Sequence, residues 1–285
     1  MDGIVVRGVL ESLAGVHLQS EATEQHMTPF QLAFLDIGRV GAGRKPAEVL
    51  WDSVDLAPRL ENLGFSRYWI TEHHEDDVAH SCPEVLLPII AGVTNTIRVG
   101  TAGVLLRLYP PLKVAKTFRL LHALFPDRID LGLARGRVPK QVEQLFARDG
   151  QLPSTSVDSG SYDHRVVELL QHLRGSGDVT VNPANVAPPE IWMLGSKQTS
   201  AELAAKLGTA LCIALFLRDA SELPDSSEIV ERYCSTFTPS PELSHPIWSV
   251  AVAGVCSDND VRANELARQF GPGLRASMVG TRTRC

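Results

Sequence analysis

The stretch that decides the fold is "IRVGTAGVLLRLYPPLKVAKTFRLLHALFPDRIDLGLA", from Ile97 to Ala134. A short apolar run is followed by a segment whose leucines and phenylalanine recur at helical spacing, and then by a second apolar run. We predict a strand, a helix that crosses over, and a second strand parallel to the first. This unit is the building block of parallel α/β folds.

The same alternation extends along most of the chain. The predicted strands are 31–37, 67–71, 97–106, 128–134, 190–196, 210–217 and 247–258. The predicted helices are 46–64, 83–94, 111–125, 140–147, 164–173, 199–208, 226–237 and 260–270. About seven such units favour a TIM (β/α)8-type barrel over an open doubly wound sheet. The nucleotide fingerprints GxGxxG and GxxxxGKS, which favour open sheets, are absent from the sequence.

The barrel prediction is one strand short. We divide the chain into an N-terminal extension, residues 1–28, and a barrel domain, residues 29–285. An eighth strand would come from "IVVRGVL", residues 4–10, or the barrel closes irregularly, or it is incomplete at the C-terminus. Pro58 stands inside the first predicted helix and should kink or split it.

Charge, hydropathy and cysteine usage exclude several classes of protein. A net charge of −6 argues against a nucleic-acid surface, which needs a basic face. No apolar run approaches the roughly 20 residues of a membrane span. The five cysteines are scattered, odd in number and without CxxC spacing, which argues against a disulfide framework and a cysteine zinc site. We therefore predict a reducing, cytoplasmic location.

In parallel barrels the active site lies at the carboxyl ends of the strands, so the residues just after each apolar run carry the chemistry. The candidates are Asp36; Glu72, His73 and His74; Thr101, Ala102, Gly103 and Arg107; Arg135 and Arg137; and Gly195, Ser196 and Lys197. The small residues at Thr101–Gly103 either let a flat ligand approach the backbone or serve tight packing between strands.

The segment "GSKQTSAELAAKLG", Gly195–Gly208, predicts an anion site. Free N–H groups at the start of a helix favour a phosphate, and Arg135 could clamp it with two hydrogen bonds. The alternative is that a serine or threonine here only caps the helix.

The histidine pair in "RYWITEHHED", Arg67–Asp76, permits three interpretations. A metal site is weak, because adjacent residues of an extended segment point to opposite faces. An acid/base site needs one histidine in the pocket. The third interpretation is a structural pair whose nitrogens are satisfied by Glu72 or by backbone carbonyls.

Several segments together resemble the bacterial luciferase-like flavin-dependent monooxygenases. The resemblance covers roughly Gln31–Phe270 and rests on "SRYWITEHH", "PEVLLPIIAGVTNTIRVGTAGVLL", "PLKVAKTFRLLHALFPDRIDLGLARGR" and "PPEIWMLGSKQTSAELAAKLG". It implies reduced FMN from a separate NAD(P)H:flavin reductase, and O2 activated as a flavin C4a-peroxide that oxygenates a small organic substrate. It also implies a homodimer, or a heterodimer with a related chain.

The resemblance assigns roles to the strand-end residues. It implies that His73 acts in acid/base chemistry, and that Thr101, Ala102 and Gly103 pack against the flavin ring with a cis peptide at Ala102–Gly103. Arg135 and Leu194–Lys197 would hold the phosphate end. The expected pocket residues are Asp36, His74 and Arg107, and no metal is expected.

The chain also departs from the family pattern. Arg107 and Leu108 replace a usual Pro-His, Lys116 replaces a glutamate, and Ala134 replaces a glycine. Two alternatives therefore stand beside the monooxygenase: a non-catalytic flavin-binding protein or partner subunit, and an oxidoreductase that uses the deazaflavin F420. The loops expected to select the substrate, Gly38–Lys45 and Pro139–Tyr162, carry no diagnostic motif.

Overall fold

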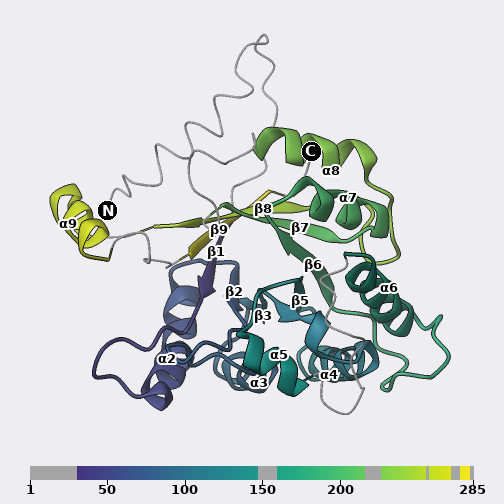
Figure 1. Ribbon diagram of the computed structural model, residues 1–285, viewed down its shortest axis with the longest axis horizontal. Coiled ribbons are helices and arrows are strands. Elements are labelled where there is room, and N and C mark those ends of the chain that lie inside the picture. Colours follow the sequence, from purple (N-terminus) through teal and green to yellow (C-terminus); the bar gives the residue numbers. More distant parts are fainter. Residues whose placement is uncertain (1–30, 147–158, 216–225, 255–256, 271–276, 283–285) are drawn as a thin grey trace, which may run out of the picture.

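The structure is a computed structural model that describes residues 31–146, 159–215, 226–254, 257–270 and 277–282. The strands are β1 Gln31–Asp36, β2 Arg67–Ile70, β3 Arg98–Thr101, β4 Val104–Leu105, β5 Ile129–Ala134, β6 Glu190–Gly195, β7 Ala210–Ala214, β8 Trp248–Ala253 and β9 Ser277–Arg282. The helices are α2 Pro46–Asn62, α3 Pro83–Val93, the 3₁₀ turn η1 Leu106–Leu108, α4 Pro111–Leu124, α5 Lys140–Phe146, α6 Ser159–Arg174, α7 Gln198–Leu207, α8 Ser226–Thr236 and α9 Asp260–Phe270. Strands and helices alternate as predicted, and the helices lie outside the sheet (Figure 1).

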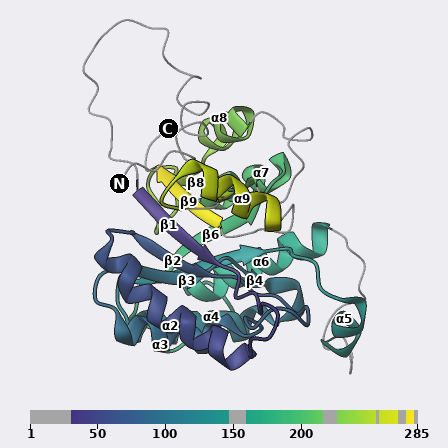
Figure 2. The same ribbon diagram turned by 90° about the vertical axis from the view of Figure 1, so that its left-hand side faces the viewer.

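The sheet closes on itself as a barrel. Its strand order is β3-β2-β1-β9-β8-β7-β6-β5-β4, and an additional pairing of β3 with β5 closes the ring. All pairings are parallel except those of β9, which runs antiparallel between β1 and β8. Figure 2 shows β9 beside β1. The predicted barrel is thereby confirmed, and its closure is irregular; the segment 4–10 lies outside the described residues.

Local sequence signals explain the helix boundaries. Lys45 precedes α2, and its backbone N–H donates to Oε2 of Glu48 at 3.0 Å, so the first turn begins with a satisfied donor. Gly64 ends the helix in a left-handed conformation with φ 84°, which glycine adopts without steric cost. The helix runs unbroken through Pro58, so the predicted split at this residue is wrong.

Apolar side chains form two layers, one inside the barrel and one between the strands and the helices. Alternate side chains from β1, β2, β6, β7 and β8 meet inside the barrel; they are Ala33, Leu35, Trp69, Trp192, Ala210, Cys212 and Ala251. The rings of Trp69 and Trp192 cross at 66° with centroids 4.9 Å apart. The intervening residues face the helices and form the larger outer core. This alternation determines which strand-end side chains reach the barrel mouth.

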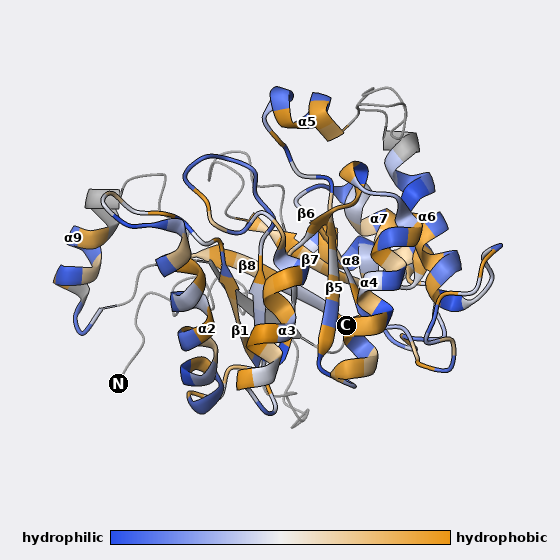
Figure 3. Ribbon diagram, turned by 90° about the horizontal axis from the view of Figure 1, so that it is seen from below, coloured by the Kyte–Doolittle hydropathy of each residue, from blue (hydrophilic) through white to orange (hydrophobic). Residues whose placement is uncertain are grey.

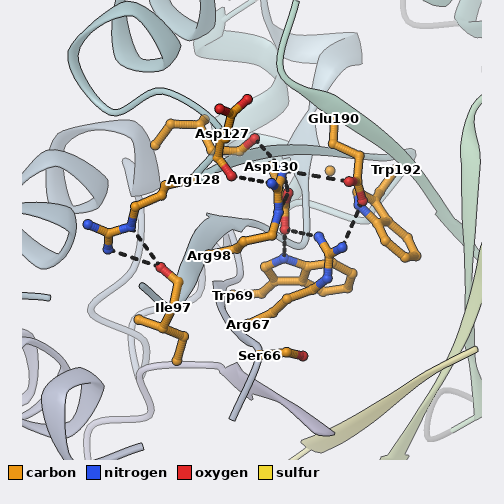
Figure 4. Close-up of polar contacts among 12 residues, drawn as sticks. Ser66, Arg67, Trp69, Ile97, Arg98, Asp127, Arg128, Asp130, Glu190 and Trp192 are labelled. Carbon is orange, nitrogen blue, oxygen red and sulfur yellow. Dashed lines mark hydrogen bonds and ion pairs between the residues drawn. The ribbon is translucent and has the colours of Figure 1, made fainter. Parts of the chain in front are cut away.

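Buried charges fill the amino-terminal end of the barrel. Asp130 is fully buried and accepts hydrogen bonds from Arg67 at 2.5 Å, from Nε of Arg98 at 2.8 Å and from the indole of Trp69 at 2.8 Å (Figure 4). Arg67 also contacts Glu190 at 2.9 Å. Burial raises the pKa of Asp130, but the two guanidinium groups outweigh it and hold that pKa below its usual value. We call Arg67, Arg98, Asp130 and Glu190 the ionic layer; it lies at the end of the barrel opposite the expected site.

The structure tests the predictions drawn from the cysteines and from the hydropathy. Cys82 and Cys212 are free, whereas Cys234 on α8 is disulfide-bonded. The bond at Cys234 runs against the sequence argument, in which the scattered spacing disfavoured a disulfide framework. No helix among the described residues is long and apolar enough to cross a membrane.

Candidate functional site

Register places the predicted residues of four strands at one edge. β5 and β6 pair in parallel with Leu133 opposite Met193, so Arg135 and Gly195 each lie two residues beyond this pair. β2 and β3 pair with Ile70 opposite Thr101, and the histidines follow β2 directly. These strands therefore deliver their terminal residues to the carboxyl end of the barrel, as the strand-end rule predicts.

Close packing between β3 and β5 accounts for part of the small-residue run. The Thr101 hydroxyl donates to the Gly132 carbonyl at 3.0 Å and accepts from the Gly132 N–H at 3.1 Å. A Cβ on Gly103 would lie 2.7 Å from the backbone of Gly132, and one on Gly132 would lie 2.0 Å from the Thr101 carbonyl oxygen. Thr101 and Gly103 are therefore required by strand packing, whatever ligand they also meet.

Ala102 and Leu194 give the barrel mouth an apolar surface. Both are partly exposed and pack on the inner apolar cluster from above. The Ala102–Gly103 peptide is cis, as predicted. The surface combines a small side chain with a leucine, so it can accept the face of a flat ring.

The two histidines have different partners. Nδ1 of His73 lies 3.2 Å from Glu75 Oε2, and about a third of the His73 side chain is exposed. Nε2 of His74 lies 2.9 Å from Glu72 Oε1, and the His74 side chain is nearly buried. The structural interpretation thus fits His74, while His73 keeps an accessible imidazole. No group of three or more His, Cys, Asp or Glu residues that could hold a metal gathers in the described ranges.

The buried carboxylate of Glu72, predicted only as a possible partner of the histidines, also binds two groups that follow β3. Besides His74, Glu72 accepts hydrogen bonds from the Tyr109 hydroxyl at 2.7 Å and from the Leu105 N–H at 2.9 Å. Phe146 of α5 packs edge-on against both His74 and Tyr109, with centroids 5.7 Å apart in each pair. The one feature of the sequence that could have indicated the hydroxyl contact is Tyr109, an aromatic residue two positions after Arg107.

The predicted anion site has two components of different character. The N-cap of α7 is Lys197, whose side chain has no acceptor and makes no capping hydrogen bond, although its backbone carbonyl accepts the Ser200 N–H at 3.0 Å. The N–H groups there lack a side-chain acceptor from the cap. Arg135 is already engaged: it pairs with Asp163 at 3.0 Å and stacks over Tyr162 at 5.0 Å.

Two predicted pocket residues have other partners. The carboxylate of Asp36 accepts from Ser53 at 2.6 Å, from Tyr68 at 2.5 Å and from the Gly38 N–H at 2.9 Å, on the side of β1 that faces α2. It is not at the barrel mouth, because its neighbour Leu35 is the residue that points inward. Arg107 forms an ion pair with Glu143 and thereby ties η1 to α5.

Comparisons with known proteins agree with this geometry. A family model described as luciferase-like monooxygenase matches residues 30–279. The Bacillus subtilis protein YvbT, which is uncharacterized, is 37% identical over 243 residues, which are 83% of this chain and 69% of YvbT. The N-acetyl-S-alkylcysteine monooxygenase of the same organism is 35% identical over 68% of this chain and 59% of its own length. The Escherichia coli luciferase-like monooxygenase is 32% identical over 82% and 69%.

Solved structures show the same architecture. Apo-MsnO8 is 38% identical, with a TM-score of 0.75 over 85% of this chain and 72% of its own. The oxygenating constituent of 3,6-diketocamphane monooxygenase, solved with FMN, is 18% identical with a TM-score of 0.66 over 86% and 73%, and it supports the fold alone. The chain therefore belongs to the luciferase-like monooxygenase family of flavin-dependent enzymes.

Proposed function

We propose that this chain is the oxygenase of a two-component system, which uses reduced FMN and O2 to oxygenate a small organic substrate. The observation that carries the proposal is the barrel mouth. There an apolar patch combines Ala102, after β3, with Leu194 at the end of β6, and β6 leads directly into the start of α7, where Lys197 provides no side-chain cap; His73 follows β2. A flat apolar ring with an anionic tail fits that combination.

The described residues fit the phosphate end of such a group. The N–H groups of the first turn of α7 receive no side-chain acceptor from Lys197, whose backbone carbonyl accepts the Ser200 N–H. The ring of Tyr162 lies under the guanidinium of Arg135, and its hydroxyl is buried without a hydrogen-bond partner among the described residues. Since buried polar groups are nearly always satisfied, an unpaired hydroxyl next to a cation favours a ligand that accepts hydrogen bonds. Gly195, Ser196 and Lys197 would hold the phosphate with Arg135.

Flavin supplies the electrons that activate O2, and the protein supplies position and a dry surface. Leu194 and Ala102 present apolar atoms to the ring and keep water away from it. His73 has an accessible imidazole, which accepts or donates a proton at Nε2 while Glu75 holds Nδ1. Glu72 and His74 fix the loop on which His73 stands.

The partners follow from the same proposal. The sequence contains no GxGxxG fingerprint for a nicotinamide cofactor, which supports a separate NAD(P)H:flavin reductase as the source of reduced flavin.

A homodimer is the assembly that we propose. Val85, Ile89 and Val93 lie four residues apart on α3 and are 64%, 43% and 47% exposed. The exposed apolar residues Trp51 of α2 and Leu120 and Leu124 of α4 lie on the two neighbouring helices. Figure 3 shows α3 largely orange beside a mostly blue α2. Exposed apolar side chains on three neighbouring helices favour an interface, and a second copy of the chain would cover them with the same residues.

One titration separates the three candidate functions. The purified full-length chain is titrated anaerobically with reduced FMN and, separately, with reduced F420, and air is then admitted with a panel of thioethers, aldehydes and ketones. Tight binding of FMN and flavin oxidation coupled to product support the proposal. Tight FMN binding with an oxidation rate equal to that of free flavin would favour the non-catalytic binder. Hydride transfer from F420 without O2 would favour the deazaflavin enzyme.

A further inference from the structure

Two loops at the barrel mouth are hydrogen-bonded to each other. The backbone of Gly38–Val40, after β1, pairs with that of Asp77–Ala79, after the histidines: the Val40 N–H donates to Asp77 and the Ala79 N–H donates to Gly38, both at 2.8 Å. Arg39 and Val78 form an isolated antiparallel bridge between them. We call these two segments the loop ribbon. It joins a loop expected to contact substrate to the loop that carries His73.

One buried side chain anchors the ribbon. The imidazole of His80 is fully buried, and its Nε2 lies 3.0 Å from the hydroxyl of Ser53 on α2. On its other side the ring lies against Gly38, where a Cβ would be only 2.5 Å from the ring atoms. Gly38 has a φ of 67°, which leaves glycine as the residue that fits both the turn and the ring.

The hydrogen bonds assign the tautomer of this imidazole. The Ser53 hydroxyl has one proton, and it donates to Asp36 at 2.6 Å. The same oxygen can then accept from Nε2–H of His80, so that Nε2 carries the proton. Nδ1 has no partner among the described residues. Burial lowers the pKa of His80, against the attraction of Asp36, so the neutral ring is favoured.

His80 is connected directly to His73. The backbone carbonyl of His80 accepts the backbone N–H of His73 at 2.9 Å, which closes the loop between them. The His80 carbonyl has a fixed position because the imidazole of the same residue is hydrogen-bonded to Ser53 on α2. We propose that His80 is a positioning residue, which sets the place of His73 at the barrel mouth through this backbone hydrogen bond. The functional half of this inference rests on the proposed function; the structural half does not.

The first test needs no cofactor. Hydrogen exchange of the His73 amide is measured in the full chain for wild type, His80→Leu and His80→Gln. Leucine fills the space but cannot donate to Ser53, whereas glutamine places an amide N–H near the position of Nε2. We expect exchange at His73 to rise at least about tenfold in His80→Leu and to return to within about threefold of wild type in His80→Gln.

A matched control separates positioning from general loss of stability. His122 on α4 is also a buried histidine whose Nδ1 lacks a partner among the described residues. His122→Leu should lower the melting temperature without changing exchange at His73. If His80→Leu behaved like His122→Leu, the proposal would be wrong. Should His80→Leu not fold, Ser53→Ala removes the acceptor of the same hydrogen bond and is expected to raise His73 exchange in the same direction.

Turnover supplies the second readout. With reduced FMN and a working substrate, we expect His80→Leu to lower kcat by about tenfold or more, with FMN binding unchanged, since small misplacements of a reacting group are costly. The flavin that is oxidised without forming product should release hydrogen peroxide. His80→Gln should restore most of the coupling between flavin oxidation and product formation. If His73→Ala left turnover intact, the catalytic role of His73 would fail, and absence of coupled turnover in the wild type would overturn the proposed function; in both cases the exchange experiment would still decide whether His80 holds the loop.

Discussion

Nε2 of His74 lies 2.9 Å from the carboxylate of Glu72, whereas His73, between them in the chain, turns its imidazole to Glu75. Because successive residues of an extended segment face opposite ways, the pair divides into a buried member and an accessible one. Burial thus distinguishes the two histidines before any ligand is considered.

The first prediction concerns His73. Replacing it by alanine should lower kcat by about 10²- to 10⁴-fold, the usual contribution of a general acid or base, and leave FMN affinity nearly unchanged. Stopped-flow turnover and an FMN binding titration measure the two effects. His74→Gln is the control, because glutamine can still donate to Glu72; equal losses in both variants would contradict a special role for His73.

The second prediction concerns the buried carboxylate of Glu72. Glu72→Gln replaces one acceptor oxygen with an NH2 group that faces donors, namely Tyr109, His74 and the Leu105 N–H. We expect a loss of about 2–4 kcal/mol in the free energy of unfolding, measured with urea. Tyr109→Phe removes one donor and should cost about 1 kcal/mol. A neutral Glu72→Gln would show that these contacts do not persist in solution.

The third prediction concerns the ionic layer. Asp130→Asn removes the fully buried charge shared by Arg67 and Arg98, leaves Arg67 with Glu190 alone, and should lower the free energy of unfolding by about 3 kcal/mol. The native pKa of Asp130 is depressed, so this stabilisation is present above the unfolded value of about 3.9 and is lost as pH falls below it. Asp77→Asn breaks an exposed ion pair with Arg39 and should change stability by less than about 1 kcal/mol.

The fourth prediction concerns Glu61, at the end of α2. Burial raises its pKa, but the N–H groups of Thr96, Ile97 and Asn95 outweigh that effect and lower it to about 2. Its contribution is therefore complete above about pH 4.5 and disappears as pH falls towards 2. Glu61→Gln should cost about 1–2 kcal/mol at pH 7. Melting curves of the two proteins should converge in acid; a difference independent of pH would refute the assignment.

The fifth prediction concerns the apolar face of α3. Ile89→Glu should convert a dimer to a monomer in light scattering at micromolar concentration, because it places a charge at the centre of the contact. Val261→Glu on α9 changes an equally apolar and more exposed position away from that face. It should leave the mass unchanged. A wild-type monomer would overturn the proposed assembly.

Much of the barrel was predictable because its signals are local. Each parallel strand is an apolar run of a few residues, and each helix repeats its apolar positions within a few turns. β9 escaped prediction because its segment pairs antiparallel with β1, with Thr281 opposite Gln31. The pairing depends on the gap that the other strands leave between β1 and β8. That gap is a property of the whole barrel, so no short window of sequence predicts it.

The sequence predicted at which end of the barrel the site lies, but not which way each strand-end side chain points. The strand-end rule brought Asp36 and Arg107 into the candidate set, because both follow apolar runs. Because Leu35 points into the barrel, Asp36 faces the helices, where its carboxylate accepts a hydrogen bond from Ser53. The partner of Arg107, Glu143, stands 36 residues further along the chain, and such a pairing depends on how α5 docks.

The position of β9 also determines the order in which the fold is completed. Domains form during synthesis from the amino terminus onward. Until residues 277–282 are available, β1 and β8 each present an unpaired edge, and such edges recruit other strands into aggregates. The edge of β1 thus stays unpaired from its own synthesis until that of β9, whereas the edge of β8 stays open only over the short interval between residues 253 and 277. The yield of folded protein should therefore depend on chaperones that shield the edge of β1.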